Sequence, residues 1–274
     1  MASLVITDRQ IADYEELGFI QSIPILSEEE VHIYRAEIDK TCEAIGGRVS
    51  RINAAHLFFR WAWELGTHPR VLDCMEQLLG PNVMLKSTRL FYKHARTSSF
   101  VGWHQDGITE MLEGAHVPSM WLGLTAATHE NGCLRVVPRS HRLGLIPHAN
   151  RPHPDNLTTQ GVTAQAQIES PHDVVMHPGE MSVHHPLVLH ASTANSSAEP
   201  RIGFTATYST PALRSSLTPV AWVRGDGPRD CFELIGGPPP VSIEAAVAAF
   251  RANEKRQQAA YPTVQGQMES AVPD

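Results

Sequence analysis

Residues 83–92 of this 274-residue chain read VMLKSTRLFY, and they mix β-branched, aromatic and polar side chains shortly after the breaker pair Gly80-Pro81. Short runs of the same texture recur, separated by turn residues, at 120–126, around Val183, at 188–190 and at 202–208. This composition is typical of strands. Several short strands at such spacing predict an all-β sandwich or barrel, which we expect to occupy residues 81–225.

Helix signals dominate the first eighty residues. Stretches with a helix-start signal or helix-like spacing lie at 7–18, 27–46 and 68–79. In the second of them, Ser27 is followed by Glu30 in the pattern of a capping box, with acidic residues in the first turn. We therefore expect a helical lead-in over residues 1–80.

Three further features complete the expected organisation. Asn131-Gly132 is a hairpin turn signal ahead of residues 133–138. Residues 144–173 are rich in His, Pro, Asn and Gln and predict a long loop of the kind that often lines a substrate site. The C-terminal segment, 226–274, contains a helical run over 243–256. Since no internal repeat is visible, we expect a single domain over residues 1–274.

Composition excludes several classes of partner. The net charge is -7 with Lys and Arg scattered along the chain, so neither nucleic acid nor an anionic membrane surface is expected as a partner. No secretion-type start and no apolar run long enough to span a bilayer are present, which predicts a soluble protein. The four cysteines form no CxxC pair, as expected in a reducing, cytoplasmic setting. A small-molecule substrate is the expected partner, and nothing predicts the oligomeric state.

The segment GWHQDG, residues 102–107, supplies the first candidate metal ligands. In an extended strand, His104 and Asp106 would point to the same face. Joined by a distant second histidine, they would form the two-histidine, one-carboxylate triad that leaves three positions open on iron(II), whereas structural zinc sites have four protein ligands. An isolated HxD also occurs by chance as two surface residues, so the pair alone defines no site.

The second histidine has one main candidate and two alternatives. His190 ends the apolar run Leu187-Val188-Leu189 and can project from a strand into a pocket, although a core histidine bonded to the backbone has the same pattern. His184 and His185 precede Pro186, which places them at a strand entrance and leaves either as an alternative third ligand.

Arg201 stands eleven residues after His190, at the start of the apolar run 202–208. A guanidinium in an apolar strand needs an anion, and its planar fork matches a carboxylate in two parallel hydrogen bonds. That anion could be a carboxylate of the same chain. It could also be one end of a dicarboxylate whose other end chelates the metal.

Together these motifs resemble the phytanoyl-CoA dioxygenase superfamily of 2-oxoglutarate oxygenases over roughly residues 85–210. The residues that carry the resemblance are Trp103-His104-Gln105-Asp106, Asn131-Gly132-Cys133-Leu134, Pro138-Arg139-Ser140-His141, His190-Ala191-Ser192 and Arg201. The resemblance implies a mainly β fold, a double-stranded β-helix (jelly-roll, cupin-like) with the N-terminal helices packed on one sheet.

The resemblance also implies a role for each matching residue. It makes His104, Asp106 and His190 the iron(II) ligands and Arg201 the partner of the distal carboxylate of 2-oxoglutarate. Ser192 matches a hydroxyl that assists this carboxylate, Trp121 an aromatic wall of the co-substrate pocket, and Arg89 a position that faces 2-oxoglutarate. The implied cofactor is iron(II), with 2-oxoglutarate and O2 as co-substrates.

The expected reaction is hydroxylation of an unactivated C–H bond of a small metabolite, with release of succinate and CO2. Similar radical halogenases replace the carboxylate of the HxD by a small residue, so Asp106 argues against halogenation. No concentrated basic patch supports a CoA thioester substrate. Substrate contacts are expected from residues 107–118, from residues 144–173 and from Arg214.

The main alternative is a cupin-like protein that binds a small ligand without catalysis, or that carries zinc or manganese in a hydrolase or isomerase. The intact ligand set argues against a non-catalytic protein, and a zinc or manganese site has no standing need for an arginine eleven residues past its last ligand.

Overall fold

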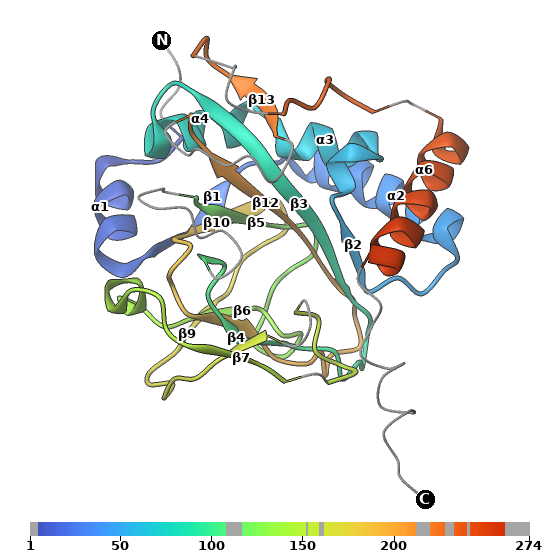
Figure 1. Cartoon of the computed structure of the whole chain (residues 1–274). Helices are drawn as coiled ribbons and strands as arrows, with labels where there is room; N and C mark the ends of the chain where they lie inside the picture. Colours follow the sequence, from blue (N-terminus) through green and yellow to red (C-terminus); the bar gives the residue numbers. More distant parts are fainter. Residues whose placement is uncertain are drawn as a thin grey trace, which may run out of the picture.

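The computed structural model describes residues 5–107, 117–151, 153–158, 162–211, 220–227, 233–239 and 242–260, and within them the fold is mainly antiparallel β with helices (Figure 1). The larger sheet has the strand order β1 (Phe19–Pro24), β10 (Glu180–His184), β5 (Ser119–Gly123), β12 (Arg201–Ser209), β3 (Val83–Lys93), β13 (Ala221–Arg224), with β2 (Arg51–Asn53) also paired to β3. The smaller sheet has the order β4 (Val101–His104), β11 (His190–Ser192), β6 (Leu134–Val136), β9 (His172–Val174). Strands β7 (His148–Asn150) and β8 (Val162–Ala164) form a separate pair.

Period-two alternation gives the large sheet two different faces. On β12, Ile202, Phe204, Ala206 and Tyr208 are buried in the main hydrophobic core, which also contains residues of the helices. The intervening residues Arg201, Thr205 and Thr207 line a cavity on the opposite face. Successive side chains of a strand point to opposite faces, so one strand packs against helices and lines the cavity at the same time.

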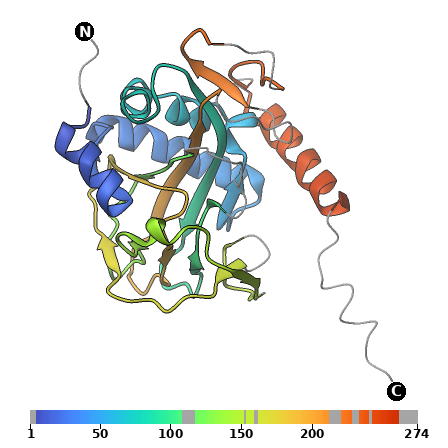
Figure 2. The same cartoon turned by 60° about the vertical axis from the view of Figure 1, so that its left-hand side comes forward.

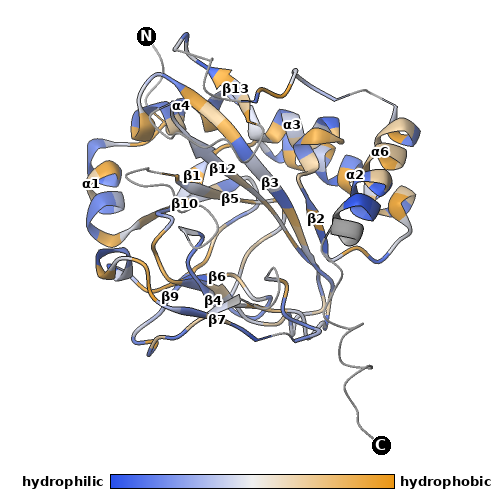
Figure 3. Ribbon diagram, in the orientation of Figure 1, coloured by the Kyte–Doolittle hydropathy of each residue, from blue (hydrophilic) through white to orange (hydrophobic). Residues whose placement is uncertain are grey.

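Helices cover the outer face of the large sheet. They are α1 (Asp8–Leu17), α2 (Glu28–Ile45), α3 (Arg60–Gly66), α4 (Pro69–Leu79) and α6 (Ile243–Ala260), with short 3-10 turns at Ala55–Leu57 and Ser140–Leu143. Trp61 packs edge-on to Phe204, and the Tyr208 hydroxyl donates to the Gly66 carbonyl at 2.8 Å. Figures 1 and 2 show α2 and α3 beside the large sheet, away from the small one, and Figure 3 shows hydrophobic residues along α3 and α4.

A second, smaller core joins the two sheets. Its buried residues are Phe19, Trp121, Ala127, Cys133, Leu134, Val136, Val174, Met176 and Val188, which come from strands of both sheets and from the segments between them. This core fills one part of the space between the sheets. The cavity that holds the candidate site occupies another part, so the sheet-to-sheet packing positions the site.

The predicted helices are present, but the lead-in is not entirely helical. Thr7 and Ser27 both form capping boxes, and α4 ends before Gly80 as expected. However, residues 1–80 also contain β1 and β2, which pair with β10 and β3. Both strands are short, and β1 is interrupted at Ser22, whose φ is 58°. Such strands depend on partners far along the chain and leave little periodic signal of their own.

Two further expectations need correction. Residues 144–173 are not a continuous loop, because β7, β8 and the start of β9 lie within them. Asn131-Gly132 does form a turn, with Gly132 at φ 75°, but the following strand β6 pairs with β11 and β9. The turn therefore leads from the large sheet into the small sheet and does not close a two-stranded hairpin. Within the described part of the chain, no helix is both long and apolar enough to cross a membrane.

Candidate metal centre

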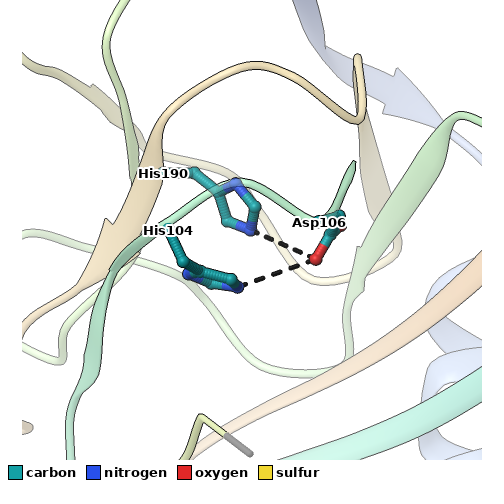
Figure 4. A group of neighbouring side chains, drawn as sticks. All are labelled: His104, Asp106 and His190. Carbon is teal, nitrogen blue, oxygen red and sulfur yellow. Dashed lines mark ion pairs between the residues drawn. The ribbon is translucent and has the colours of Figure 1, made fainter. Parts of the chain in front are cut away.

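Two strands of the small sheet bring His104 and His190 together. His104 ends β4, His190 begins β11, and the two are direct partners in the antiparallel register. Opposite residues in such a pair project to the same face, so the imidazoles meet with ring centroids 4.1 Å apart. Asp106 follows β4 in a turn and points at both rings (Figure 4). One donor atom from each of the three side chains lies within 4.8 Å of the others.

The ring orientations suit metal binding. Asp106 Oδ1 lies 3.6 Å from His104 Nε2 and 3.7 Å from His190 Nε2. Each Nδ1 lies near a backbone carbonyl, Gly102 at 2.9 Å for His104 and Val188 at 3.0 Å for His190. A neutral imidazole that donates from Nδ1 keeps a lone pair on Nε2, and backbone acceptors commonly fix metal-binding histidines in this way.

His184 takes a different place from the one considered in the sequence. Its Nε2 lies 3.2 Å from Asp106 Oδ2, and the Ser119 hydroxyl donates to the same oxygen at 2.6 Å. These contacts leave Oδ1 facing His104 and His190. The other alternative, His185, lies beside His141 with the two rings tilted and their centroids 5.1 Å apart, and it is not part of the donor group.

The charge state of the cluster follows from its burial and its partners. Burial alone would raise the pKa of Asp106, but His190, His104 and His184 together hold it well below its usual value. Burial, followed by the neighbouring His104, lowers the pKa of His190 well below its usual value. The carboxylate is therefore ionised and His190 neutral at pH 7, which are the forms that bind a divalent cation.

Gln105, between the two HxD residues, ties the turn to distant segments. Its buried amide donates to the Gly144 and Leu187 carbonyls at 2.9 and 2.6 Å and accepts from the Ile146 amide at 2.8 Å. The contact with Leu187 reaches the segment that leads into His190. One side chain thus couples the positions of both halves of the donor group.

Arg201 lies in the same cavity, buried, with 2% of its surface exposed. Its guanidinium carbon is 5.2 Å from the centre of the Trp121 ring. No described residue accepts a hydrogen bond from its side chain or forms an ion pair with it, and its Nε is buried without a partner. Burial lowers the pKa of Arg201 to about 10, so the group stays charged at pH 7. An uncompensated charge in such a place calls for an anion.

Lys93, which the sequence interpretation did not single out, is the cross-strand partner of Arg201. It is fully buried, and its Nζ donates to the Ser192 hydroxyl at 2.7 Å and to the Thr193 and Gly132 carbonyls. Burial, and then the charge of Arg201, lower its pKa to about 5. Lys93 is therefore neutral at pH 7, and Arg201 supplies the positive charge at this end of the cavity, where Ser192 also lines the wall. An anion at this positive end would offset the charge of Arg201.

Trp121 forms a wall beside this positive end. A Cβ placed on Gly203 would lie 2.2 Å from Cζ2 of the Trp121 ring, which is closer than carbon atoms can approach. The ring therefore lies flat across a strand position that only glycine can occupy. This close approach brings the indole face under the Arg201 guanidinium, where a cation–π contact is favourable.

The cavity has an empty volume of about 910 Å³, including solvent at its mouth. It contains all of the predicted site residues: His104, Asp106, His190, Arg201, Ser192, Trp121 and Arg89. Arg51, His184, Ser119, Leu157 and Thr158 also line it, and of these only Leu157 and Thr158 come from the predicted substrate loop 144–173. Residues 108–116 and Arg214, also predicted to contact substrate, lie outside the described residues.

Comparison with known proteins gives the family. Residues 14–203 match the family model of phytanoyl-CoA dioxygenase (PhyH), and the chain belongs to this family. The resemblance drawn from the HxD, His190 and Arg201 motifs is thereby confirmed.

Individual relatives are distant. The chain is 24% identical over 216 residues to phytanoyl-CoA dioxygenase of Bos taurus, which covers 67% of this chain and 63% of that protein, just under two thirds of its length. It is 25% identical over 224 residues to methylphosphonate hydroxylase of Gimesia maris, and the match covers 74% of this chain and 80% of that protein. Among solved structures, the apo form of the non-heme monooxygenase ThoJ is 28% identical with a TM-score of 0.74, covering 91% of this chain and 96% of ThoJ.

Proposed function

We propose that this chain is an iron(II)- and 2-oxoglutarate-dependent dioxygenase that hydroxylates an unactivated C–H bond of a small metabolite and releases succinate and CO2. One observation carries the proposal. A buried guanidinium without an ionic partner among the described residues lies in the same cavity as a two-histidine, one-carboxylate donor group. Such a pair of features matches a ligand that chelates a metal at one end and carries a carboxylate at the other.

The residues present fit the metal. His104 and His190 would bind it through Nε2 and Asp106 through Oδ1, because their other polar atoms already have partners. Iron(II), bound together with 2-oxoglutarate and O2, would supply the oxidising chemistry. Three protein ligands leave room for both co-substrates, whereas a structural zinc site would have a fourth ligand.

The opposite end of the cavity fits the distal carboxylate of 2-oxoglutarate. Arg201 would form two parallel hydrogen bonds with it, and the hydroxyl of Ser192, held by Lys93, would add a third. Trp121 would wall the pocket. Arg89, further along the same face, would face 2-oxoglutarate from the side of the metal. The chain thus orients the co-substrate and excludes water around it.

The arrangement of strands supports a more specific fold. We assign the seven-stranded and four-stranded sheets to the two halves of a double-stranded β-helix, with the N-terminal helices on the outer face of the larger half. We also retain a single domain over residues 1–274. A soluble, cytoplasmic protein remains a prediction from charge and cysteine spacing, as does the absence of nucleic-acid and membrane partners.

The alternative is a cupin-like protein that binds a small ligand or uses zinc or manganese. It accounts for the donor group but leaves Arg201 buried in the cavity with no partner for its charge among the described residues. A buried guanidinium without an anion is destabilising unless a ligand offsets its charge. The geometry therefore favours the oxygenase.

The decisive experiment is succinate formation from 2-oxoglutarate by the purified protein with iron(II), in air and under anaerobic conditions. We expect formation that requires both iron and O2 and that falls at least about 100-fold in His104→Ala and in Asp106→Ala, because each change removes a metal ligand. Arg48→Gln, an exposed change outside the cavity, serves as the control. Equal rates in both ligand variants and the wild type would exclude the proposed centre.

A further inference from the structure

Besides Arg201, the cavity contains two arginines that neither the metal nor the distal carboxylate of 2-oxoglutarate takes as a partner. Arg51 on β2 and Arg89 on β3 both line it, together with Arg201. In the antiparallel register Arg51 is opposite Phe91 and Asn53 is opposite Arg89, so the two arginines are diagonal neighbours on one face. Residues in this relation lie about 7–8 Å apart at the backbone, within reach of long side chains. A single small anion could therefore contact both guanidinium groups.

These two arginines are distinct from the positive end of the cavity at Arg201 and Ser192. Arg89 is four residues along β3 from Lys93, which corresponds to about 13 Å of strand. Since Lys93 is the cross-strand partner of Arg201, the Arg51–Arg89 pair belongs to a different part of the cavity from the distal carboxylate of 2-oxoglutarate.

The charges of the cavity do not balance. Among the described residues that line it, Arg51, Arg89 and Arg201 are cationic and Asp106 is the carboxylate. A divalent metal and dianionic 2-oxoglutarate cancel each other, so their binding leaves the excess of two positive charges unchanged. Like charges this close disfavour each other, and the pKa of Arg51 is lowered by burial and then by the charge of Arg89.

Among the described residues, no anionic side chain forms an ion pair with either arginine. Arg51 donates from Nη1 to the Leu157 carbonyl, which is neutral. For Arg89, no described residue forms a side-chain hydrogen bond or ion pair with it. Across the sheet, Thr205 is opposite Arg89, and Thr205 and Thr207 add hydroxyl groups to the same wall of the cavity.

We infer that Arg51 and Arg89 form a binding subsite for an oxyanion of the primary substrate, a carboxylate or a phosphonate-type group. The inference rests on the proposed function and names the substrate class as small anionic metabolites. Binding there would fix the anionic end of the substrate in the cavity that also contains the metal ligands, so that a C–H bond elsewhere in the molecule can be held near the metal.

The test is direct binding to the protein loaded with iron(II) under anaerobic conditions and saturated with 2-oxoglutarate. Calorimetric titrations use methylphosphonate against its neutral dimethyl ester, and propionate against propionamide. We expect at least one anion to bind saturably and the neutral partners not to bind. Arg51→Gln and Arg89→Gln should each raise its Kd about 10-fold or more, since each removes charged hydrogen bonds. Arg51→Lys should retain part of the affinity, because it keeps the charge without the fork.

Arg48→Gln is the matched control, since Arg48 is an exposed arginine three residues before Arg51. This variant should bind the anion like the wild type. Thermal unfolding checks that the variants fold. If Arg51→Gln does not fold, Arg89→Gln and Arg51→Lys provide the test. The inference is overturned if neither anion binds the wild type, if neutral probes bind equally well, or if the arginine variants retain full affinity. It is also overturned if the lost affinity falls on 2-oxoglutarate alone.

Failure of the proposed function would look different. Methylphosphonate binding that depends on Arg51 without any iron-dependent succinate formation would keep the anion subsite and exclude the oxygenase. Succinate formation without binding of either anion would keep the oxygenase and exclude the anion subsite.

Discussion

Arg201 is the residue whose environment is hardest to explain without a ligand. It is charged, 2% exposed and packed on an aromatic face, with its Nε unsatisfied. A buried charge that lacks a partner costs several kcal/mol, so a chain that retains one gains something from it when a ligand is bound. The adjacent Lys93 differs, because its Nζ has three oxygen partners and burial lowers its pKa to about 5, so it adds no charge at pH 7.

Substitution of Arg201 tests this explanation. Arg201→Ala should weaken 2-oxoglutarate binding by about 10- to 100-fold while iron(II) affinity is kept, because the guanidinium contacts the far carboxylate and not the metal. Calorimetric titration of the metal-loaded protein with 2-oxoglutarate measures this effect. Arg135→Ala is a suitable control, since Arg135 forms an ion pair with Asp173 and does not line the cavity. Unchanged 2-oxoglutarate affinity in Arg201→Ala would remove the assigned role.

At the scale of the element, β12 connects the core to the cavity. One face of the strand buries Ile202, Phe204, Ala206 and Tyr208 against the helices, and the other face carries Arg201 and the two threonines of the cavity wall. Between them, Gly203 allows the Trp121 ring to cross the strand. The indole position, and with it the shape of the positive end, depends on the absence of one Cβ.

Gly203→Ala should therefore act on stability and binding together. The new methyl group would overlap the indole, so either Trp121 or β12 must move, and overpacking of this kind costs typically about 1–3 kcal/mol. Chemical denaturation measures the stability change, and 2-oxoglutarate titration measures the expected loss of affinity. Gly236→Ala is the matched control, because an added Cβ there meets nothing within 4 Å. Wild-type values for both quantities in Gly203→Ala would contradict the packing described for β12.

At the scale of the whole molecule, His56 links stability to pH. It is 2% exposed between the helices and β3, its Nδ1 is 3.0 Å from the Thr88 hydroxyl, and burial lowers its pKa to about 4. The unfolded chain binds a proton at this residue near pH 6.5, whereas the folded protein does not until about pH 4. The stabilising contribution is therefore present above pH 6.5 and is lost as the pH falls from 6.5 to 4.

We expect His56→Gln to flatten the acid side of the stability profile. Between pH 7 and pH 4, the wild type should lose about 3 kcal/mol more free energy of unfolding than the variant, corresponding to the shifted pKa. Urea denaturation of the metal-free protein at a series of pH values gives the comparison. The other titratable groups are the same in both proteins, so the difference between the two profiles reports on His56. Parallel profiles would show that His56 is protonated in the folded state as readily as in the unfolded chain.

Local signals predicted a large share of the fold. Capping residues, breakers and side-chain periodicity act over a few residues, so the helices at 7–18, 27–46 and 68–79 and the strands β3, β5 and β12 were predicted correctly. Short strands such as β1, β2, β7 and β8 were missed, because a three- to six-residue strand is stabilised by its partners and not by its own propensity. The turn at Asn131-Gly132 was predicted, but as part of a hairpin, whereas the following strand β6 pairs with β11 and β9.

The candidate site was likewise predictable from the sequence only in part. The residue types and spacing of His104, Asp106, His190 and Arg201 were legible in the sequence, because a metal triad and a carboxylate partner each need particular chemical groups in a fixed order. Lys93 and Arg51 could not be selected, since lysine and arginine are common and their importance depends on what lies beside them. His184 was considered as a metal ligand, whereas its Nε2 lies beside Asp106 Oδ2. Only the pairing of β3 with β12 and with β2 places Lys93 opposite Arg201 and Arg51 diagonal to Arg89. The sequence thus determined which chemical groups the chain contains. The long-range strand register decided which charges face each other in one cavity.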